Sequence, residues 1–264
     1  MARLALGIAY NGLSYQGWQS QLSGQTVQDH LEKALGRFTQ HRVSTLCAGR
    51  TDAGVHGLMQ VVHFDTPLDR SEFSWVRGPN AFLPRDIAVQ WARLVPDTFH
   101  CRASALSRRY AYILLQCPVR PSVDAGRVGW VCADLDMRAM QQAADILVGE
   151  KDFTSFRASA CQAQSPVKNL MKLAIKRQGA YWRFEFEANA FLHHMIRNIM
   201  GCLLMVGDGR RPPEWVHSVL QARDRDAAAP TFSPNGLYFL GPSYDPKWRM
   251  PEQTALFDGL PGAF

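Results

Sequence analysis

One loop of the chain combines residue types that could carry out chemistry. The segment 48–57 reads Ala-Gly-Arg-Thr-Asp-Ala-Gly-Val-His-Gly, so a carboxylate (Asp52), a guanidinium (Arg50) and an imidazole (His56) fall among three glycines. Glycines permit tight turns and let a ligand approach the backbone closely. The loop has neither the Gly-Lys-Ser/Thr ending nor the G-x-G-x-x-G spacing of phosphate-binding loops. Two interpretations stay open: a reactive carboxylate, or a hairpin loop in which Asp52 bonds only to its own backbone.

A lone aspartate suits a particular kind of reaction. Aspartate side chains have a reference pKa of about 3.9 and are ionised at neutral pH without help from their surroundings. Such a carboxylate can act as a nucleophile or as an electrostatic partner at a sugar carbon. It needs no metal, and His56, His193 and His194 do not have the H-E-x-x-H spacing of a zinc site. We therefore expect no metal in this protein.

Arg197 is the second informative side chain. It stands among methionines and isoleucines in the segment 195–200, on a helix that is otherwise apolar. A guanidinium in such a place has to reach solvent or find an anion. Pairing with Asp52 would satisfy both charges and hold the carboxylate in place. The alternative is that Arg197 extends to solvent or pairs with a structural acid.

Aromatic side chains beside basic ones form the third feature. Tyr110 and Tyr112 lie on one face of a predicted strand, directly after Arg108 and Arg109. An aromatic ring beside cations can stack on a base that has left its helix. Most tyrosines in strands serve packing instead. Leu237, taken alone, is typical of a strand core.

The residues 1–105 supply elements that could position the loop. Alternation of apolar residues predicts strands at 4–10, 43–47, 59–64 and 87–91. A helix begins after Thr26, which together with Asp29 resembles a capping box, and 71–82 is a weaker helix because it contains Gly78 and Pro79. The predicted order is β-α-β-β-α-β.

The residues 106–245 repeat this order. We predict strands at 109–115, 170–176, 181–188 and 237–240, a hairpin at 178–179, and helices from Asp136, at 191–206 with Gly207 as the stop, and at 214–220. Two such units predict an α+β fold of two ferredoxin-like halves, each with an antiparallel sheet and helices on one face, and a catalytic cleft between them. The tail 246–264 is rich in proline and is expected to be irregular.

Composition narrows the class of protein. The chain has 264 residues, of which 47% are hydrophobic, so a packed core is expected and disorder is not. A net charge of +6 is compatible with a polyanionic partner. The six cysteines form no C-x-x-C pair, which favours free thiols in the cytoplasm over disulfides or a zinc ribbon. The segment 191–206 contains two histidines, an arginine and an asparagine, so we expect no membrane span.

Taken in order, these motifs resemble those of the tRNA pseudouridine synthase A (TruA) family. The sequence Gly-Arg-Thr-Asp-Ala-Gly-Val-His at 49–56 is the most specific of them. The resemblance covers nearly the whole chain and includes the segments 10–12, 15–19, 80–84, 102–103, 109–112, 152–156, 191–198 and 236–238. Two departures are local: Asn11 stands where an aspartate is common, and Cys101 replaces a small residue.

The resemblance implies a function and a role for four residues. Asp52 matches the nucleophile, Tyr110 the tyrosine that packs against the target base, Arg197 the arginine paired with the nucleophile, and Leu237 an apolar residue of the uracil pocket. Members of the family convert uridines 38, 39 and 40 in the anticodon stem-loop of tRNA to pseudouridine. They are homodimers that hold tRNA in a basic cleft and need neither cofactor nor metal.

Other basic residues are candidates for contacts with RNA. Arg50 adjoins the nucleophile and is expected to hold the substrate. The remaining candidates for phosphate contacts are Arg108, Arg109, Lys168, Lys172 and Arg177.

Two other functions compete with this one. A non-catalytic RNA-binding protein of two ferredoxin-like modules would share the strand order, but the aromatic RNP1 stretch of RNA-recognition modules is missing from the sequence. An N-glycosidase would hydrolyse the bond to the base instead of remaking it, and the single carboxylate speaks only weakly against it.

Overall fold

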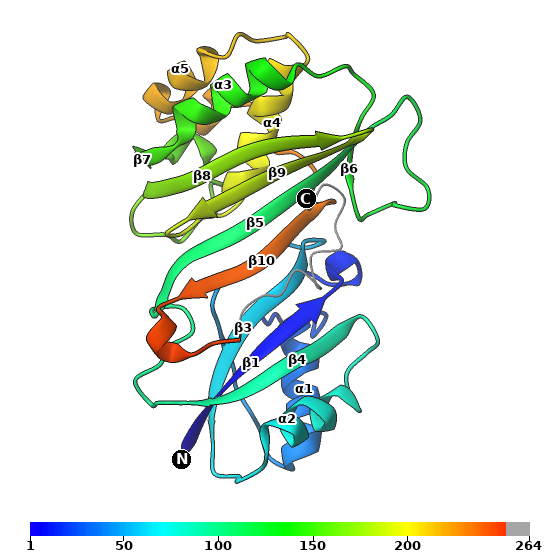
Figure 1. The fold of residues 1–264 in the computed structure, drawn as a ribbon, viewed down its shortest axis with the longest axis vertical. Helices are drawn as coiled ribbons and strands as arrows, with labels where there is room; N and C mark the ends of the chain where they lie inside the picture. Colours follow the sequence, from blue (N-terminus) through cyan, green and yellow to red (C-terminus); the bar gives the residue numbers. More distant parts are fainter. Residues whose placement is uncertain (252–264) are drawn as a thin grey trace. The chain divides into compact units, whose positions relative to one another are not determined.

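Strand β1 (Ala2–Tyr10) is the central strand of the N-terminal sheet in the computed structural model, which describes residues 1–251 (Figure 1). It pairs antiparallel with β3 (His56–Thr66) on one side and with β4 (Ile87–Val95) on the other. The two-residue strand β2 (Leu46–Cys47) pairs antiparallel with β3. The order β4-β1-β3-β2 is that of a ferredoxin-like sheet, as the sequence predicts.

Two helices cover one face of this sheet, α1 (Val27–Thr39) and α2 (Glu72–Asn80) (Figure 1). The N-terminus of α1 is capped as predicted, since Thr26 Oγ1 accepts a hydrogen bond from the Asp29 N–H at 3.2 Å. One apolar stripe of α1 packs on alternate residues of β1 in a buried cluster that includes Leu4, Leu6, Ile8, Val27, Leu31 and Leu35. Apolar residues that repeat every second position in the strand and about every 3.6 positions in the helix therefore pack in one core.

The opposite face of β1 is buried as well. Ala5 lies there in a second apolar cluster with Val61, Phe99 and Cys101, and Tyr244 packs against this cluster. Tyr244 belongs to β10 (Leu237–Tyr244), whose Tyr238 pairs in parallel with His56 of β3. β1 is thus covered on both faces, which explains its nearly continuous apolar run.

The chain forms two compact units. One consists of Met1–Arg108 with 238–251, and the other of Arg109–Leu237. The division falls within β5 (Ala105–Gln116) and within β10, so the chain passes between the units along extended strands.

The second unit contributes a further run of neighbouring strands. Strand β5 neighbours β9 (Tyr181–Ala188), followed by β8 (Val167–Gln178) and β7 (Gly149–Asp152). The pairs β7–β8 and β8–β9 are antiparallel. Gln178 lies opposite Tyr181, and Gly179 has a φ of +59°, so the predicted hairpin is present. The short strands β7 and β6 (Gly129–Val131, parallel to β5) were not predicted, because neither is long enough to show a period.

Three helices belong to this unit: α3 (Met137–Leu147), α4 (Met195–Gly207) and α5 (Trp215–Ala222). Asp136 caps α3 through hydrogen bonds to its Oδ1 from the N–H groups of Arg138 and Ala139. Helix α4 stops at Gly207 as predicted but begins at Met195, not at residue 191. His194 has a φ of +63°, a left-handed conformation that cannot continue a right-handed helix.

The prediction of an α+β fold with mainly antiparallel strand pairing is confirmed. Within residues 1–251, no helix combines the length and the apolar content that a bilayer crossing requires. The tail expected at 246–264 begins with a 3-10 turn, Pro246–Trp248. Residues 252–264 of the tail lie outside the described residues.

Candidate active site

The loop that carries Asp52 joins β2 to β3 in the first unit. At its start, the Ala48 N–H donates to the Val61 carbonyl at 2.9 Å. The buried side chain of Gln60 then holds Gly49 in both directions: its amide donates to the Gly49 carbonyl at 2.5 Å, and its Oε1 accepts from the Gly49 N–H at 3.3 Å. The loop therefore leaves the sheet from a fixed position.

Thr51 fastens the loop to the N-terminal strand. Its hydroxyl shares a hydrogen bond of 2.8 Å with the phenol of Tyr10, and its carbonyl accepts from the Trp18 N–H at 3.0 Å. Burial raises the pKa of the Tyr10 phenol well above its usual value, so the phenol stays neutral and can donate. Both anchors belong to the residue next to Asp52.

Two glycines let the backbone of residues 12–17 lie directly against the loop. Gly17 has a φ of +85°, and a Cβ there would lie 2.6 Å from the Thr51 carbonyl oxygen. A Cβ at Gly12 would collide with the Val55 carbonyl. Neither position can carry a side chain without moving the loop.

His56 closes the loop at the first residue of β3. It is buried, its Nδ1 accepts the Gly12 N–H at 3.2 Å, and its ring stacks on Tyr238 with centroids 4.6 Å apart. The imidazole is therefore used to hold the loop. Asp52 itself is partly exposed and Arg50 is exposed, so the loop places a carboxylate and a guanidinium at or near the surface.

In the second unit, the predicted base-stacking tyrosine is packed against an aromatic neighbour. Tyr110 is 8% exposed, and its ring meets that of Phe191 edge to face at a centroid distance of 5.1 Å. Tyr112, two residues along β5, is fully buried and donates to the Ser233 carbonyl at 3.0 Å. Of the two tyrosines, only Tyr110 keeps part of its surface open.

Arg197 lies in the first turns of α4 and is partly buried. Its Nε donates to the Phe232 carbonyl at 2.9 Å, and its own carbonyl accepts the Phe232 N–H at 3.1 Å. Burial raises the pKa of the nearby Tyr112 phenol, and the positive charge of Arg197 opposes that rise. Arg197 is therefore held by the segment that leads to Leu237.

Leu237 follows a glycine that its position requires. Gly236 has a φ of +87°, and a Cβ there would collide with the Ile113 carbonyl of β5. The Gly236 carbonyl accepts the Ile113 N–H at 2.8 Å, and Leu237 is buried. The segment 232–237 thus connects these residues: Phe232 is bonded to Arg197, and Gly236, next to Leu237, is bonded to the strand that carries Tyr110. Asp52 belongs to the other unit, and its pairing with Arg197 stays a prediction.

The candidate RNA contacts differ in how their charge is used. Arg108 donates to the carbonyls of Ala48 and Arg102, at 3.3 and 2.5 Å, and so braces the start of the Asp52 loop. Lys172 forms an ion pair of 2.8 Å with Glu185.

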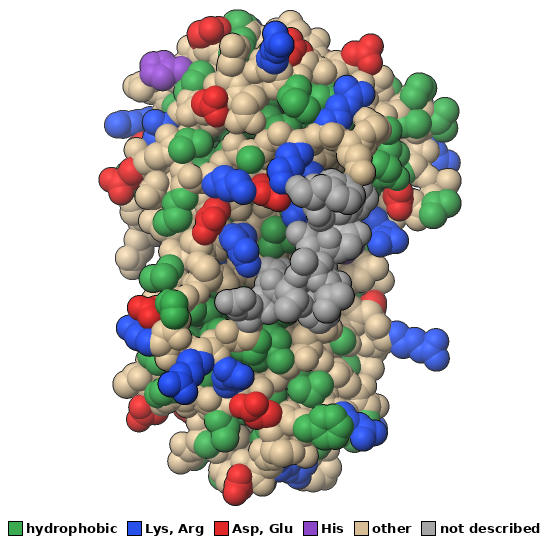
Figure 2. Space-filling view, in the orientation of Figure 1, with side chains coloured by type: hydrophobic (Ala, Val, Ile, Leu, Met, Phe, Trp, Pro, Cys, Tyr) green, Lys and Arg blue, Asp and Glu red, His purple; other side chains and the backbone are tan. Residues whose placement is uncertain are grey.

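Lys168, Arg177 and Arg109 complete the set. Lys168 donates to two backbone carbonyls, and burial lowers its pKa. Arg177 is exposed beside the ring of Trp182, and Arg109 is partly buried. On the face drawn in Figure 2, Lys and Arg side chains are dispersed among the acids and do not form one patch.

A buried charge in β9 escapes sequence reasoning. Arg183 is 2% exposed and pairs with Glu185 at 3.0 Å, although the alternation in this strand indicates a solvent-facing position. Burial would raise the pKa of Glu185, but the hydrogen bonds and charges of Lys172 and Arg183 hold it below its usual value. The burial of Arg183 results from tertiary packing, which the sequence of β9 alone does not indicate.

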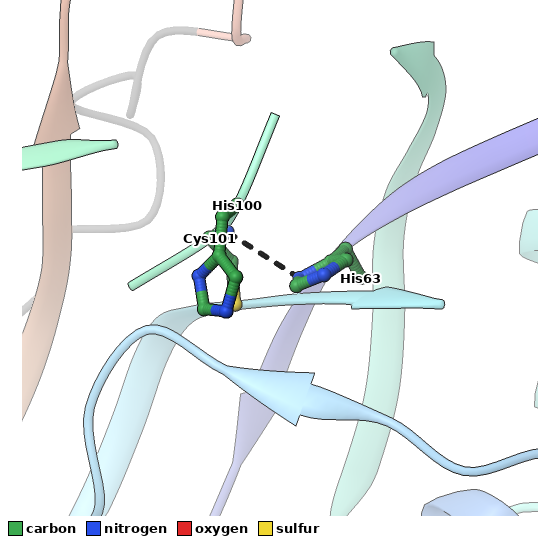
Figure 3. A group of neighbouring side chains, drawn as sticks. All are labelled: His63, His100 and Cys101. Atoms are coloured by element: carbon green, nitrogen blue, oxygen red, sulfur yellow. Dashed lines mark hydrogen bonds between the residues drawn. The ribbon is translucent and has the colours of Figure 1, made fainter. Parts of the chain in front are cut away.

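Three side chains in the first unit have metal-ligand chemistry: His63, His100 and Cys101 (Figure 3). One donor atom of each lies within 4.8 Å of the others. However, the Nδ1 of His63 accepts the Cys101 N–H at 3.3 Å, and the Nδ1 of His100 accepts two backbone N–H groups at 3.2 Å. A neutral histidine that accepts a hydrogen bond at Nδ1 carries its proton on Nε2. Neither ring nitrogen then has a free lone pair for a metal, whereas a ligating histidine binds the metal with one nitrogen and donates the N–H of the other. We assign these residues to holding the segment 99–103 against the sheet.

This arrangement makes stability depend on pH through His63. Burial, with the charges of His100 and Arg3, lowers the pKa of His63 to about 4. The unfolded chain then binds the proton more readily than the folded one, so stability is fully present above about pH 6.5 and falls as the pH drops towards 4. We expect the free energy of unfolding in urea to decrease by about 2 kcal/mol more between pH 7 and pH 5 in the wild type than in His63→Gln. Equal decreases in both proteins would contradict this assignment.

A comparison with protein families gives the same family as the sequence motifs. A family model described as tRNA pseudouridine synthase matches residues 7–102 and 143–245. The matched stretches contain Asp52, Arg197 and Leu237, and Tyr110 lies between them.

Similar proteins extend along the whole length. The tRNA pseudouridine synthase A of Albidiferax ferrireducens is 73% identical over 259 residues, which cover 98% of this chain and 100% of that protein. The tRNA pseudouridine synthase A of Paracidovorax citrulli is 67% identical over 277 residues, with the same coverage. The chain belongs to the tRNA pseudouridine synthase family.

Proposed function

We propose that this protein converts uridine to pseudouridine in tRNA, with Asp52 as the nucleophile. The observation that carries the proposal is the full-length match to tRNA pseudouridine synthases, combined with a fixed loop that presents a single partly exposed carboxylate. The uridines 38, 39 and 40 of the anticodon stem-loop are the proposed targets. The proposal also includes a cytoplasmic homodimer, as the resemblance to the family implies.

The reaction begins when the target uridine leaves its stack, which costs a few kcal/mol. Asp52 then assists cleavage of the bond between C1′ and N1, either by attack at C1′ or by removing a proton at C2′. The freed uracil turns so that C5 faces C1′. The C5–C1′ bond then forms as the bond from Asp52 to C1′ breaks, or as the C2′ proton is returned. C5 loses its proton to solvent, and N1 takes up a proton. No outside reactant is needed, because the product is an isomer of the substrate.

Residues of the second unit would enclose the base. Tyr110 offers a ring that is held edge to face by Phe191, and Leu237 offers a buried apolar side chain. Such an enclosure excludes water, which would otherwise capture the sugar and leave an abasic site. In this proposal Arg197 supplies the positive charge that holds the Asp52 carboxylate in place.

Replacement of Asp52 tests the nucleophile. We expect Asp52→Asn to abolish tritium release from tRNA labelled at C5 of uridine, because an amide is a poor nucleophile and base, while the affinity for tRNA is largely kept. Asp69→Asn, at an exposed acid of the same unit, is the matched control and should react like the wild type. Equal losses of affinity and turnover in Asp52→Asn would argue against a catalytic role. Abasic sites in the product would indicate a glycosidase.

The pairing of Asp52 with Arg197 is tested by a double-mutant cycle. We expect the stability losses of Asp52→Asn and Arg197→Met to be non-additive by about 1 kcal/mol, because either change alone removes the same interaction. The hydrogen bond from Arg197 to Phe232 is lost in both backgrounds and cancels in the cycle. Additive losses in urea unfolding would sink the pairing.

The role of Tyr110 is tested by comparing two substitutions. Tyr110→Phe keeps the ring and should retain most of kcat/KM. Tyr110→Ala removes the stacking surface and should lower kcat/KM roughly tenfold or more, since stacking of a base on an aromatic ring contributes about 1–3 kcal/mol. Similar kinetics of the two variants would show that the ring does not stack on the base.

A further inference from the structure

The C-terminal end of α1 carries basic side chains that the proposed reaction does not use. A surface pocket of about 590 Å³ opens there. Its lining consists mainly of basic residues with one aromatic ring, and we name it the α1 basic surface: Lys33, Gly36, Arg37, Gln40, His41, Arg42 and Phe82. Its Lys, Arg and His side chains are all exposed.

Carboxylates do not neutralise this surface. Within the part of the chain that the structure describes, Lys33, Arg37 and Arg42 form no ion pair. The two acids of α1 are used elsewhere: Asp29 accepts hydrogen bonds at the start of the helix, and Glu32 accepts from the backbone and hydroxyl of a threonine before β2. The net charge of the surface is therefore strongly positive.

Aromatic rings orient the cations around the surface. The Arg37 guanidinium lies 4.6 Å from the centre of the Phe82 ring, which is 39% exposed. Arg70 covers the neighbouring Phe38 in the same way, at 4.2 Å. A guanidinium already held over a ring loses little freedom when its N–H groups bind a phosphate.

The position on the helix indicates which kind of anion fits. The free N–H groups at the start of a helix form a ready-made site for a small phosphate. This surface lies at the end of α1, where carbonyl groups repel an anion at close range. Long, spread side chains that reach away from the backbone suit the repeated phosphates of a nucleic acid instead.

Helix α1 also fixes the distance to the proposed reaction site. Its first residues are bonded to residues 17–18, since the Val27 and Gln28 N–H groups donate to the carbonyls of Gly17 and Trp18, and Trp18 in turn bonds to Thr51. At about 1.5 Å per residue, Lys33 lies roughly 9 Å and Arg37 roughly 15 Å along the helix from Val27, so the basic surface extends away from the end of α1 that is bonded near the Asp52 loop. An RNA that reached both places would have to extend well beyond the reacting nucleotide.

We infer that the α1 basic surface binds the phosphate backbone of the substrate tRNA outside the anticodon stem-loop. This inference rests on the proposed function for the identity of the RNA. The surface would add affinity for whole tRNA and leave the chemistry at Asp52 unchanged.

The test compares two RNAs by fluorescence anisotropy over a range of KCl concentrations. Arg37→Gln/Arg42→Gln should weaken binding of a whole tRNA transcript about tenfold and reduce its salt dependence by about two phosphate contacts. Binding of the isolated anticodon stem-loop and kcat at saturating tRNA should not change. Arg37→Lys/Arg42→Lys keeps both charges and should keep the salt dependence.

The matched control is Arg120→Gln/Arg138→Gln, which removes the same net charge from exposed positions of the second unit. An equal loss in the control, or an equal loss for the stem-loop and the whole tRNA, would overturn the inference. So would reduced thermal stability with unchanged affinity for tRNA, which would reduce the cations to a role at the helix end. Binding is measured directly and does not depend on turnover. Absence of pseudouridine would therefore refute the proposed function alone, and the binding data would still test the inference.

Discussion

Close contact between two backbone segments, 12–18 and 51–55, is the constraint on which the candidate site depends. Side chains are missing at Gly12 and Gly17, so the two segments meet without a spacer. Tyr10 and Trp18 then bond to Thr51, the residue before Asp52. An aspartate on a free loop would sample many orientations, whereas this one projects from a backbone that is bonded on both sides. The loop is therefore held to the N-terminal strand and to the segment that follows it.

The second unit uses the same device at a different place. Gly236 lies against β5. Phe232 is bonded to Arg197 of α4 twice: its carbonyl accepts from the Arg197 side chain, and its N–H donates to the Arg197 carbonyl. Tyr110 comes from β5, Arg197 from α4 and Leu237 from the first position of β10, yet each lies in a backbone segment that hydrogen bonds hold in place. Such hydrogen bonds are the kind of support that holds a site in one geometry.

Sequence reasoning located the elements that have a long, regular period and the loops that have special residue types. The strands of the first sheet, the cap at Thr26 and the stop at Gly207 follow from local rules. The start of α4 did not, because the left-handed conformation of His194 has no signature in the residue type. Burial of Arg183 and the ion pair of Lys172 depend on partners that are distant in the chain or on the covered face of a strand. The charge of a lysine can be read from the sequence, whereas its availability cannot.

Helix α1 sets the spacing between the Asp52 loop and the α1 basic surface. One end is bonded to residues 17–18, and the other presents Arg37. A helix turns by about 100° and advances about 1.5 Å per residue. Inserting one residue into α1 would hardly change its length but would turn Arg37 to another side of the molecule. The same insertion would rotate the apolar stripe of Val27, Leu31 and Leu35 away from the core, so the packing of α1 and the direction in which Arg37 points are set by one helical register.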